Sequence, residues 1–184
     1  MYTTTMRVQK RNNDYEDVSF DKILRRIRSL CIGHEFSKKL QIDPTIIAQK
    51  VCSEIFDGVK TSQLDEQSSQ TSISMYSKDP EYGILASRIV ISNHHKETSP
   101  SFFEVIESLY GKDIIKEYLY DIVVSNREQI EDTIDHMKDY NIDYFGFKTL
   151  EKSYLLKVDG KIVERPQYLF MRVALCIHRD NLEK

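Results

Sequence analysis

Long apolar runs are missing from this sequence, and so is a strong charge of either sign. No hydrophobic stretch approaches the roughly 20 residues that cross a bilayer, and Met1 to Thr5 lack the apolar segment of a signal peptide. The formal net charge of −3 gives no reason to expect a polyanion or an anionic membrane surface as partner. We therefore expect a cytoplasmic protein that binds neither nucleic acid nor membranes.

Cysteine is scarce, and no two cysteines are close in sequence. Cys31, Cys52 and Cys176 form no CxxC pair, which excludes a zinc ribbon and a thioredoxin-type motif. The five histidines also lack metal-ligand spacing, because the neighbours His94 and His95 would point to different faces of a helix. We expect no structural metal.

The first half of the chain predicts a small β-hairpin followed by four amphipathic helices. Strands at 7–10 and 16–20 flank the turn-forming Asn12-Asn13-Asp14, which leaves Lys10 and Arg11 at the bend. Apolar periodicity and the helix starts Asp43-Pro44 and Asp79-Pro80 predict helices at about 21–31, from 44 towards Gly58, from 61 to 75, and from 80 to the mid-90s. Ser99-Pro100 then marks a boundary between domains 1–98 and 99–184.

The second half predicts further helices and one more hairpin. The helices are expected at about 101–110, 114–124, 128–137 and 168–177. Asp159-Gly160, between two apolar stretches, is a strong signal for a tight hairpin turn. The fold class that follows is mainly α with small β-hairpins, an α+β arrangement.

Several polar residues in the first half have the chemistry to hold a nucleoside triphosphate. Lys10 and Arg11 supply positive charge, and a helix that begins near Asp21 supplies free N–H groups and a favourable dipole. Thr61 and Asp65, four residues apart, share one helix face, where Thr61 caps the helix and Asp65 accepts from ribose hydroxyls. From these residues alone, a solvated basic turn before an ordinary capped helix is the better interpretation. The arginines at 25, 26 and 28 are interpreted as the solvated face of their helix.

Together with His95-Lys96-Glu97-Thr98, these pieces resemble the ATP-cone, the regulatory domain at the N-terminus of the large subunit of class I ribonucleotide reductase. The resemblance implies ATP or dATP, with Mg²⁺, as allosteric effector, and a role for Asp65 in the response to dATP. It implies no catalytic residue in this region. The site residues that it implies are Lys10, Arg11, Glu16, Asp17, Val18, Ser19, Phe20, Asp21, Lys22, Thr61, Asp65 and Lys96.

The second half resembles the segment that leads into the catalytic α/β barrel of the same subunit. The resemblance lies in the string from Tyr144 to Leu156, in Asp159-Gly160-Lys161, and in Glu164-Arg165-Pro166-Gln167. It implies an oxidoreductase that makes deoxyribonucleotides with a thioredoxin-type reductant, and whose catalytic cysteines lie beyond this chain. We therefore expect this chain alone to be inactive, and Leu169, Phe170 and Val173 to be exposed without the barrel.

The resemblance also implies partners: a second large subunit, reached through the cone, and a radical-generating small subunit. Two alternatives stay open. One is a free-standing nucleotide sensor, which the lack of CxxC pairs and the reductase-like second half disfavour. The other is a degenerate ATP-cone that serves as an interaction module, which the intact set of Lys10, Arg11, Thr61 and Asp65 disfavours.

Overall fold

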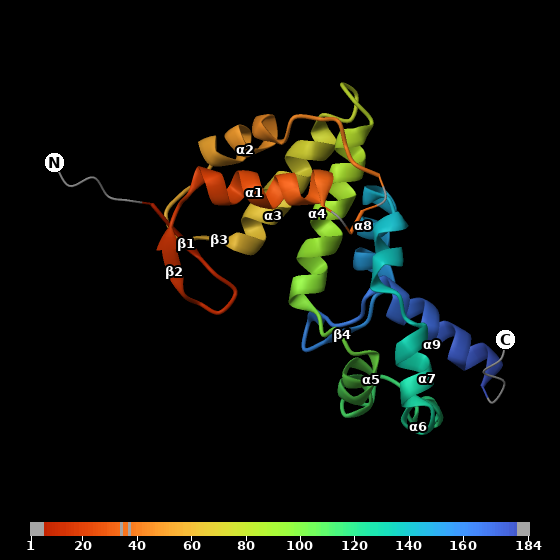
Figure 1. Cartoon of the computed structure of the whole chain (residues 1–184). Coiled ribbons are helices and arrows are strands. Elements are labelled where there is room, and N and C mark those ends of the chain that lie inside the picture. Colours follow the sequence, from red (N-terminus) through yellow and green to blue (C-terminus); the bar gives the residue numbers. More distant parts are fainter. Residues whose placement is uncertain (1–5, 34, 37, 180–184) are drawn as a thin grey trace. The chain divides into compact units, whose positions relative to one another are not determined.

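As the computed structural model shows (Figure 1), the described part of the chain folds mainly into helices with two small β-sheets. The structure describes residues 6–33, 35–36 and 38–179. Contacts divide the chain into two compact units, Met1–Asn93 and His94–Lys184. The predicted α+β class is confirmed.

The first unit contains the predicted hairpin, but within a three-stranded sheet. Strand β1 (Arg7–Gln9) pairs antiparallel with β2 (Tyr15–Asp17) and parallel with β3 (Val59–Lys60), so that the strand order is β2-β1-β3. Sequence analysis missed β3, because two residues are too short to produce a periodic pattern. Gly58, at a φ of +80°, turns the chain into β3, a backbone conformation that glycine adopts without strain.

All four predicted helices of the first half are present. They are α1 (Phe20–Ile32), α2 (Pro44–Ser53), α3 (Thr61–Ser74) and α4 (Glu81–Glu97), and α4 continues into the second unit. Asp43 caps α2 by accepting from the Thr45 N–H, and Asp79 accepts from the Glu81 N–H. The core residues that these helices bury include Ile27, Leu30, Ile47, Val51, Leu85 and Ile89.

The predicted cap of α3 is wrong. The N-cap position belongs to Lys60, and Thr61 is the first helical residue. The physical reason is that β3 runs directly into α3, so that Lys60 is the last residue with extended backbone angles. Its N–H donates to the side-chain oxygen of Gln63, at 3.0 Å, in place of a threonine cap.

A buried arginine from α4 closes the C-terminal end of α1. The Arg88 guanidinium donates to the carbonyls of Leu30, at 2.8 Å, and Lys38, at 2.6 Å. It also lies 4.0 Å from the ring centre of Phe36. Arg88 is only 5% exposed, so its guanidinium depends on these carbonyls for its hydrogen bonds.

The second unit contains α5 (Phe102–Tyr110), α6 (Glu117–Ser125), α7 (Arg127–Thr133), a 3₁₀ helix (His136–Asn141), α8 (Tyr144–Ser153), β4 (Lys157–Val158), β5 (Lys161–Ile162) and α9 (Pro166–His178). The predicted hairpin is confirmed: Asp159 and Gly160 have φ values of 50° and 79°, the positive pair that a type I′ turn requires. The stretch predicted as one helix at 128–137 divides into α7 and the start of the 3₁₀ helix. Sequence periodicity did not predict α8.

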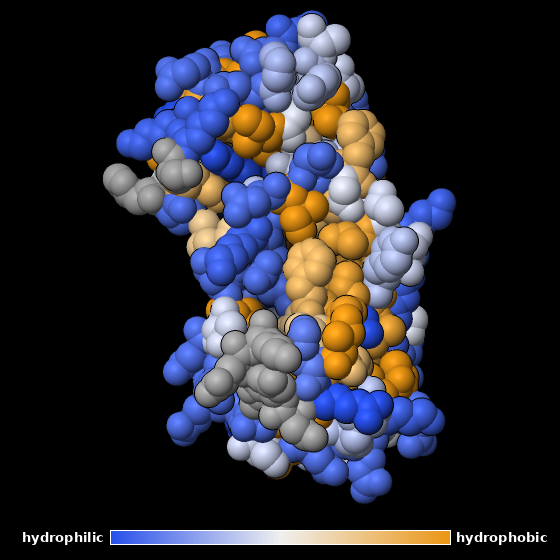
Figure 2. All heavy atoms as spheres, turned by 90° about the vertical axis from the view of Figure 1, so that its right-hand side faces the viewer, coloured by the Kyte–Doolittle hydropathy of each residue, from blue (hydrophilic) through white to orange (hydrophobic). Residues whose placement is uncertain are grey.

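One side of α9 is apolar and exposed. Phe170, Val173 and Ile177 are 52%, 42% and 69% exposed, and their spacing places them on one helix face. Figure 2 shows that apolar side chains are exposed at the molecular surface. The expectation of exposure is confirmed for Phe170 and Val173 and is wrong for Leu169. Successive residues of a helix point about 100° apart, and Leu169 turns with Tyr168 towards the buried side.

A buried polar network joins the start of α9 to the rest of the second unit. Arg165 donates to the Thr98 hydroxyl and to the carbonyls of His95 and Thr98, each at 2.9 Å. Glu164, which is fully buried, accepts from Arg172 at 2.6 Å and from the Leu156 N–H at 2.8 Å. Each of these buried charges therefore has charged or backbone partners, as burial requires.

We predict that Arg88→Met destabilises the chain by about 2–4 kcal/mol, because the carbonyls at the end of α1 lose their buried donor. Urea unfolding followed by circular dichroism measures the change. Arg28→Met, an exposed position on α1, is the matched control and is expected to change stability little. Equal stability of the two variants would contradict the role of Arg88.

We also predict that stability falls on acidification. Burial lowers the pKa of His94, whose Nε2–H donates to the Glu164 carbonyl at 2.8 Å, and burial lowers the pKa of His136 as well. Below about pH 6.5 the unfolded chain binds protons that the folded chain still excludes, so the free energy of unfolding decreases there. His94→Gln is expected to lose less stability than the wild type between pH 7.5 and 5.5, whereas the exposed control His178→Gln is expected to lose as much.

Candidate functional site

A small basic cavity of about 110 Å³ lies between the hairpin turn and the start of α3 in the first unit. Both sides of the cavity contribute cations and hydrogen-bonding groups. Its lining residues are Gln9, Lys10, Arg11, Asn13, Lys60, Thr61 and Ser62. The structure thus brings together three of the predicted site residues, Lys10, Arg11 and Thr61.

The cavity owes its shape to the parallel pairing of β1 with β3. Gln9 lies opposite Lys60 in this ladder, so the turn after β1 and the helix after β3 begin side by side. Lys60 and Ser62 were missed by sequence analysis for the same reason that β3 was missed. The available signal was indirect: a lysine directly before the helix that carries Thr61 and Asp65.

The start of α3 gives this cavity a second source of positive potential. Thr61 and Ser62 are the first two residues of a 14-residue helix, whose first-turn N–H groups have no acceptor within the helix. The helix dipole adds a partial positive charge at the same end. Residues from the start of α3 therefore line the cavity, whereas sequence analysis assigned the equivalent donors to the start of α1.

One glutamate links two of the predicted lysines. Glu16 Oε2 lies 2.7 Å from Lys10 Nζ and 3.0 Å from Lys22 Nζ. The hydrogen bond with Glu16 raises the pKa of Lys10, and the hydrogen bonds from Lys10 and Lys22 lower the pKa of Glu16. All three groups are solvent-accessible, so an incoming anion can compete with Glu16 for either lysine at small cost.

Asp65 lies beside the cavity and is held by two arginines. It is 7% exposed. Arg11 Nη2 lies 3.4 Å from its Oδ2, while Arg26 donates from Nε to Oδ1 at 3.2 Å and from Nη2 to Oδ2 at 3.4 Å. Arg26 Nη2 also donates to the Ser92 hydroxyl at 2.9 Å, and Arg11 donates to the Asn93 side chain.

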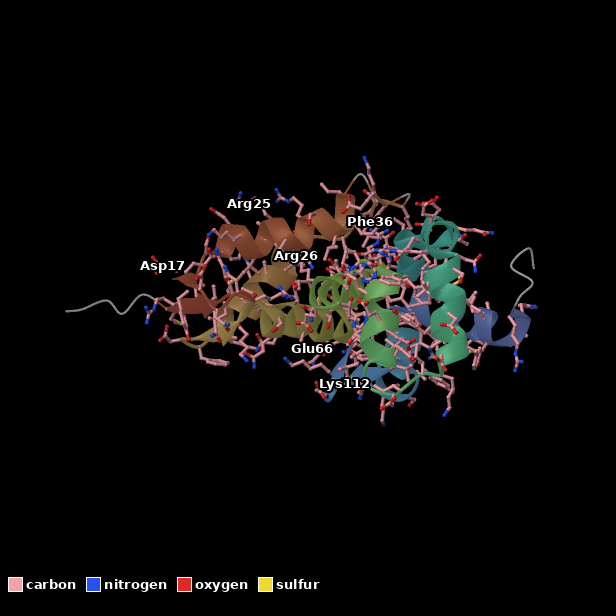
Figure 3. The ribbon with its side chains drawn as sticks, turned by 90° about the horizontal axis from the view of Figure 1, so that it is seen from below. Asp17, Arg25, Arg26, Phe36, Glu66 and Lys112 are labelled. Atoms are coloured by element: carbon pink, nitrogen blue, oxygen red, sulfur yellow. The ribbon has the colours of Figure 1, made fainter. Side chains whose placement is uncertain are left out.

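The interpretation of Arg26 as part of a solvated face is therefore wrong, although it holds for Arg25 and Arg28, which are exposed. Figure 3 shows Arg25 on the outer side of α1 and Arg26 on the side that faces α3. The sequence did contain a signal: Arg26 lies three residues after Ile23 and four before Leu30, on the apolar face of the helix.

The other predicted residues do not line the cavity. The Val18 N–H donates to the Met6 carbonyl. Ser19 is the N-cap residue of α1, but its side chain makes no capping hydrogen bond. Asp17, Phe20 and Asp21 are exposed (Figure 3 labels Asp17). Lys96 lies in the last turn of α4, within the second unit. Contact of these residues, and of Glu16 and Lys22, with a nucleotide stays a prediction.

Neither a metal centre nor a membrane segment is found in the part of the chain that the structure describes. No three His, Cys, Asp or Glu side chains there are grouped so that they could hold a metal ion. No helix there is both long enough and apolar enough to cross a membrane.

The model of the ATP cone domain family matches residues 6–97, half of the chain. The chain belongs to the ATP cone family. The model of the ribonucleotide reductase all-alpha domain matches residues 140–184. An ATP cone indicates that the chain binds a nucleotide effector, and the cavity described above lies within this cone.

Curated relatives of this ATP-cone chain are large subunits of ribonucleoside-diphosphate reductase. Identity is 46% over 190 residues with the subunit from Dictyostelium discoideum, 42% over 187 with that from Arabidopsis thaliana, and 45% over 187 with that from vaccinia virus. Each alignment covers 97% of this chain but only 22–24% of the relative. The chain therefore corresponds to the N-terminal regulatory portion of this oxidoreductase subunit, and the resemblance found in the sequence is confirmed.

Proposed function

We propose that this chain is an allosteric nucleotide-binding module that takes ATP as activator and dATP as inhibitor of a ribonucleoside-diphosphate reductase. The observation that carries the proposal is the cavity lined by Lys10, Arg11 and Lys60 at the start of α3. Three cations and a helix N-terminus are the groups that a triphosphate requires.

The size of the cavity supports a phosphate-binding role. At about 110 Å³ it is well below the roughly 300 Å³ of a typical small-molecule pocket, so it takes the phosphates rather than the whole nucleotide. The base then lies outside it, along the segment from Glu16 to Lys22. Each charge-assisted hydrogen bond to a phosphate contributes about 1.5–3 kcal/mol. A Mg²⁺ ion bound with the triphosphate would supply further positive charge there.

Asp65 is the group suited to the sugar. Its carboxylate accepts from a ribose hydroxyl, and one such bond, at about 1.5–3 kcal/mol, separates two nucleotides by a factor of ten or more. ATP and dATP differ by one hydroxyl. Asp65 completes the proposed site beside the residues that line the cavity, Thr61 among them.

The relatives support a role for this chain within a larger protein. We infer that residues 1–98 form the cone, that residues 99–184 form a helical segment which precedes the catalytic barrel, and that the complete protein makes deoxyribonucleotides from ribonucleoside diphosphates. Its partners are a second large subunit and a radical-generating small subunit. Nucleotide occupancy then controls subunit assembly through a coupling free energy between the two events.

Thermal and urea unfolding of the 184-residue chain with Mg²⁺ and ATP, dATP or GTP tests this function. ATP or dATP at 100 times its dissociation constant is expected to stabilise the fold by about 2.7 kcal/mol. Lys60→Ala is expected to weaken this binding at least tenfold, because it removes a cation from the cavity. Lys50→Ala, at an exposed position in the last turn of α2, is the matched control and is expected to bind as the wild type does.

Absence of stabilisation by any adenine nucleotide would contradict the proposal and favour the interaction-module alternative. Equal loss of binding in Lys60→Ala and Lys50→Ala would contradict the position of the phosphate site while leaving nucleotide binding in place.

A further inference from the structure

We propose that Arg26 is a positioning residue, which fixes the Asp65 carboxylate for recognition of the nucleotide sugar and allows Arg11 to leave Asp65 for the phosphates. This inference rests on the proposed function. It deepens that function by naming the group that keeps sugar recognition and phosphate binding compatible.

Arg26 and Arg11 contact the Asp65 carboxylate in different ways. Arg26 presents two N–H donors, Nε to Oδ1 at 3.2 Å and Nη2 to Oδ2 at 3.4 Å, so that its planar fork contacts both carboxylate oxygens. Arg11 contacts Oδ2 through Nη2, at 3.4 Å. Arg26 thus determines the orientation of the carboxylate, whereas Arg11 contributes charge at one oxygen.

Arg26 is itself held in place. Its Nη2 donates to the Ser92 hydroxyl of α4 at 2.9 Å, and Ser92 is 9% exposed. The guanidinium therefore joins α1, α3 and α4 in one set of hydrogen bonds. Because the Arg26 guanidinium is hydrogen-bonded to both α3 and α4, it keeps its position when Arg11 moves.

Arg11 can pair with the Asp65 carboxylate or with a phosphate bound in the cavity. It lines the cavity, and it contacts Asp65 and Asn93. A bound triphosphate carries several negative charges and competes with the single carboxylate for this guanidinium. If Arg11 turned to the phosphates and Arg26 were absent, the nearly buried Asp65 carboxylate would lose both of these arginine contacts, which is unfavourable. Arg26 removes this penalty.

An arginine suits this task better than a lysine does. A lysine ammonium would keep the charge but would contact the carboxylate as a point, without fixing the plane of its two oxygens. Loss of the fork would let Asp65 rotate, and the discrimination between ribose and deoxyribose would fall even where the triphosphate still bound.

Isothermal titration of the 184-residue chain with Mg-ATP and Mg-dATP tests the proposal through the ratio of the two dissociation constants. The variants are Arg26→Lys, Asp65→Asn and the double variant, with Arg25→Gln as the exposed neighbour on α1. We expect Arg26→Lys to change the ratio at least threefold, in the same direction as Asp65→Asn. The double variant is expected to match Asp65→Asn, and Arg25→Gln to match the wild type.

Three results would overturn the inference. The first is an unchanged ratio in Arg26→Lys, even with weaker binding of both nucleotides, since that is what a purely structural role produces. The second is a wild-type ratio of one, which would remove sugar recognition but leave the proposed nucleotide binding intact. The third is additive effects in the double variant. Absence of any binding by the wild type would overturn the proposed function as well.

Ser92→Ala keeps the test decisive if Arg26→Lys folds poorly. It removes the hydroxyl that anchors Arg26 without changing any charge. We expect a smaller change of the ratio in the same direction, and an unchanged ratio in this well-folded variant would overturn the inference. Circular dichroism without ligand establishes that each variant is folded.

Discussion

The site of this ATP cone depends on one short contact, the parallel pairing of β1 with β3. Two strands of two or three residues, about fifty positions apart in the chain, place the hairpin turn beside the start of α3. Lys10 and Arg11 then face Lys60 across a cavity of about 110 Å³. Without this pairing, the hairpin turn and the start of α3 would carry separate surface charges, each of which binds an anion weakly.

Positive charge gathered in this way needs compensation while no ligand is bound. Glu16 compensates Lys10 and Lys22 at the surface, and the nearly buried Asp65 is shared between Arg11 and Arg26. The two carboxylates differ in what an incoming triphosphate does to them. When a triphosphate takes Lys10 or Lys22 away from Glu16, water can solvate the Glu16 carboxylate instead. The Asp65 carboxylate is nearly buried, so it needs an arginine that remains beside it. Sugar recognition and phosphate binding are therefore linked through the arginines.

Sequence patterns were sufficient for most of the fold and for three of the seven residues that line the cavity. Periodicity and capping signals predicted the four helices of the first half and most of those in the second, though not α8, and Asp159-Gly160 predicted its turn, because these features are local in the chain. The cap of α3, strand β3, and the roles of Lys60 and Arg26 were not predicted, because they arise from a non-local pairing. In particular, a run of three arginines indicates solvent exposure until the helix face that carries Arg26 meets Asp65.

Titration with Mg-ATP followed by ¹H–¹⁵N chemical-shift mapping locates the bound phosphates. We predict that the largest shifts occur at the amides of Arg11, Asn13, Thr61 and Ser62, on both sides of the cavity. Shifts confined to one side, or to other parts of the cone, would contradict a site formed by the hairpin turn and the start of α3.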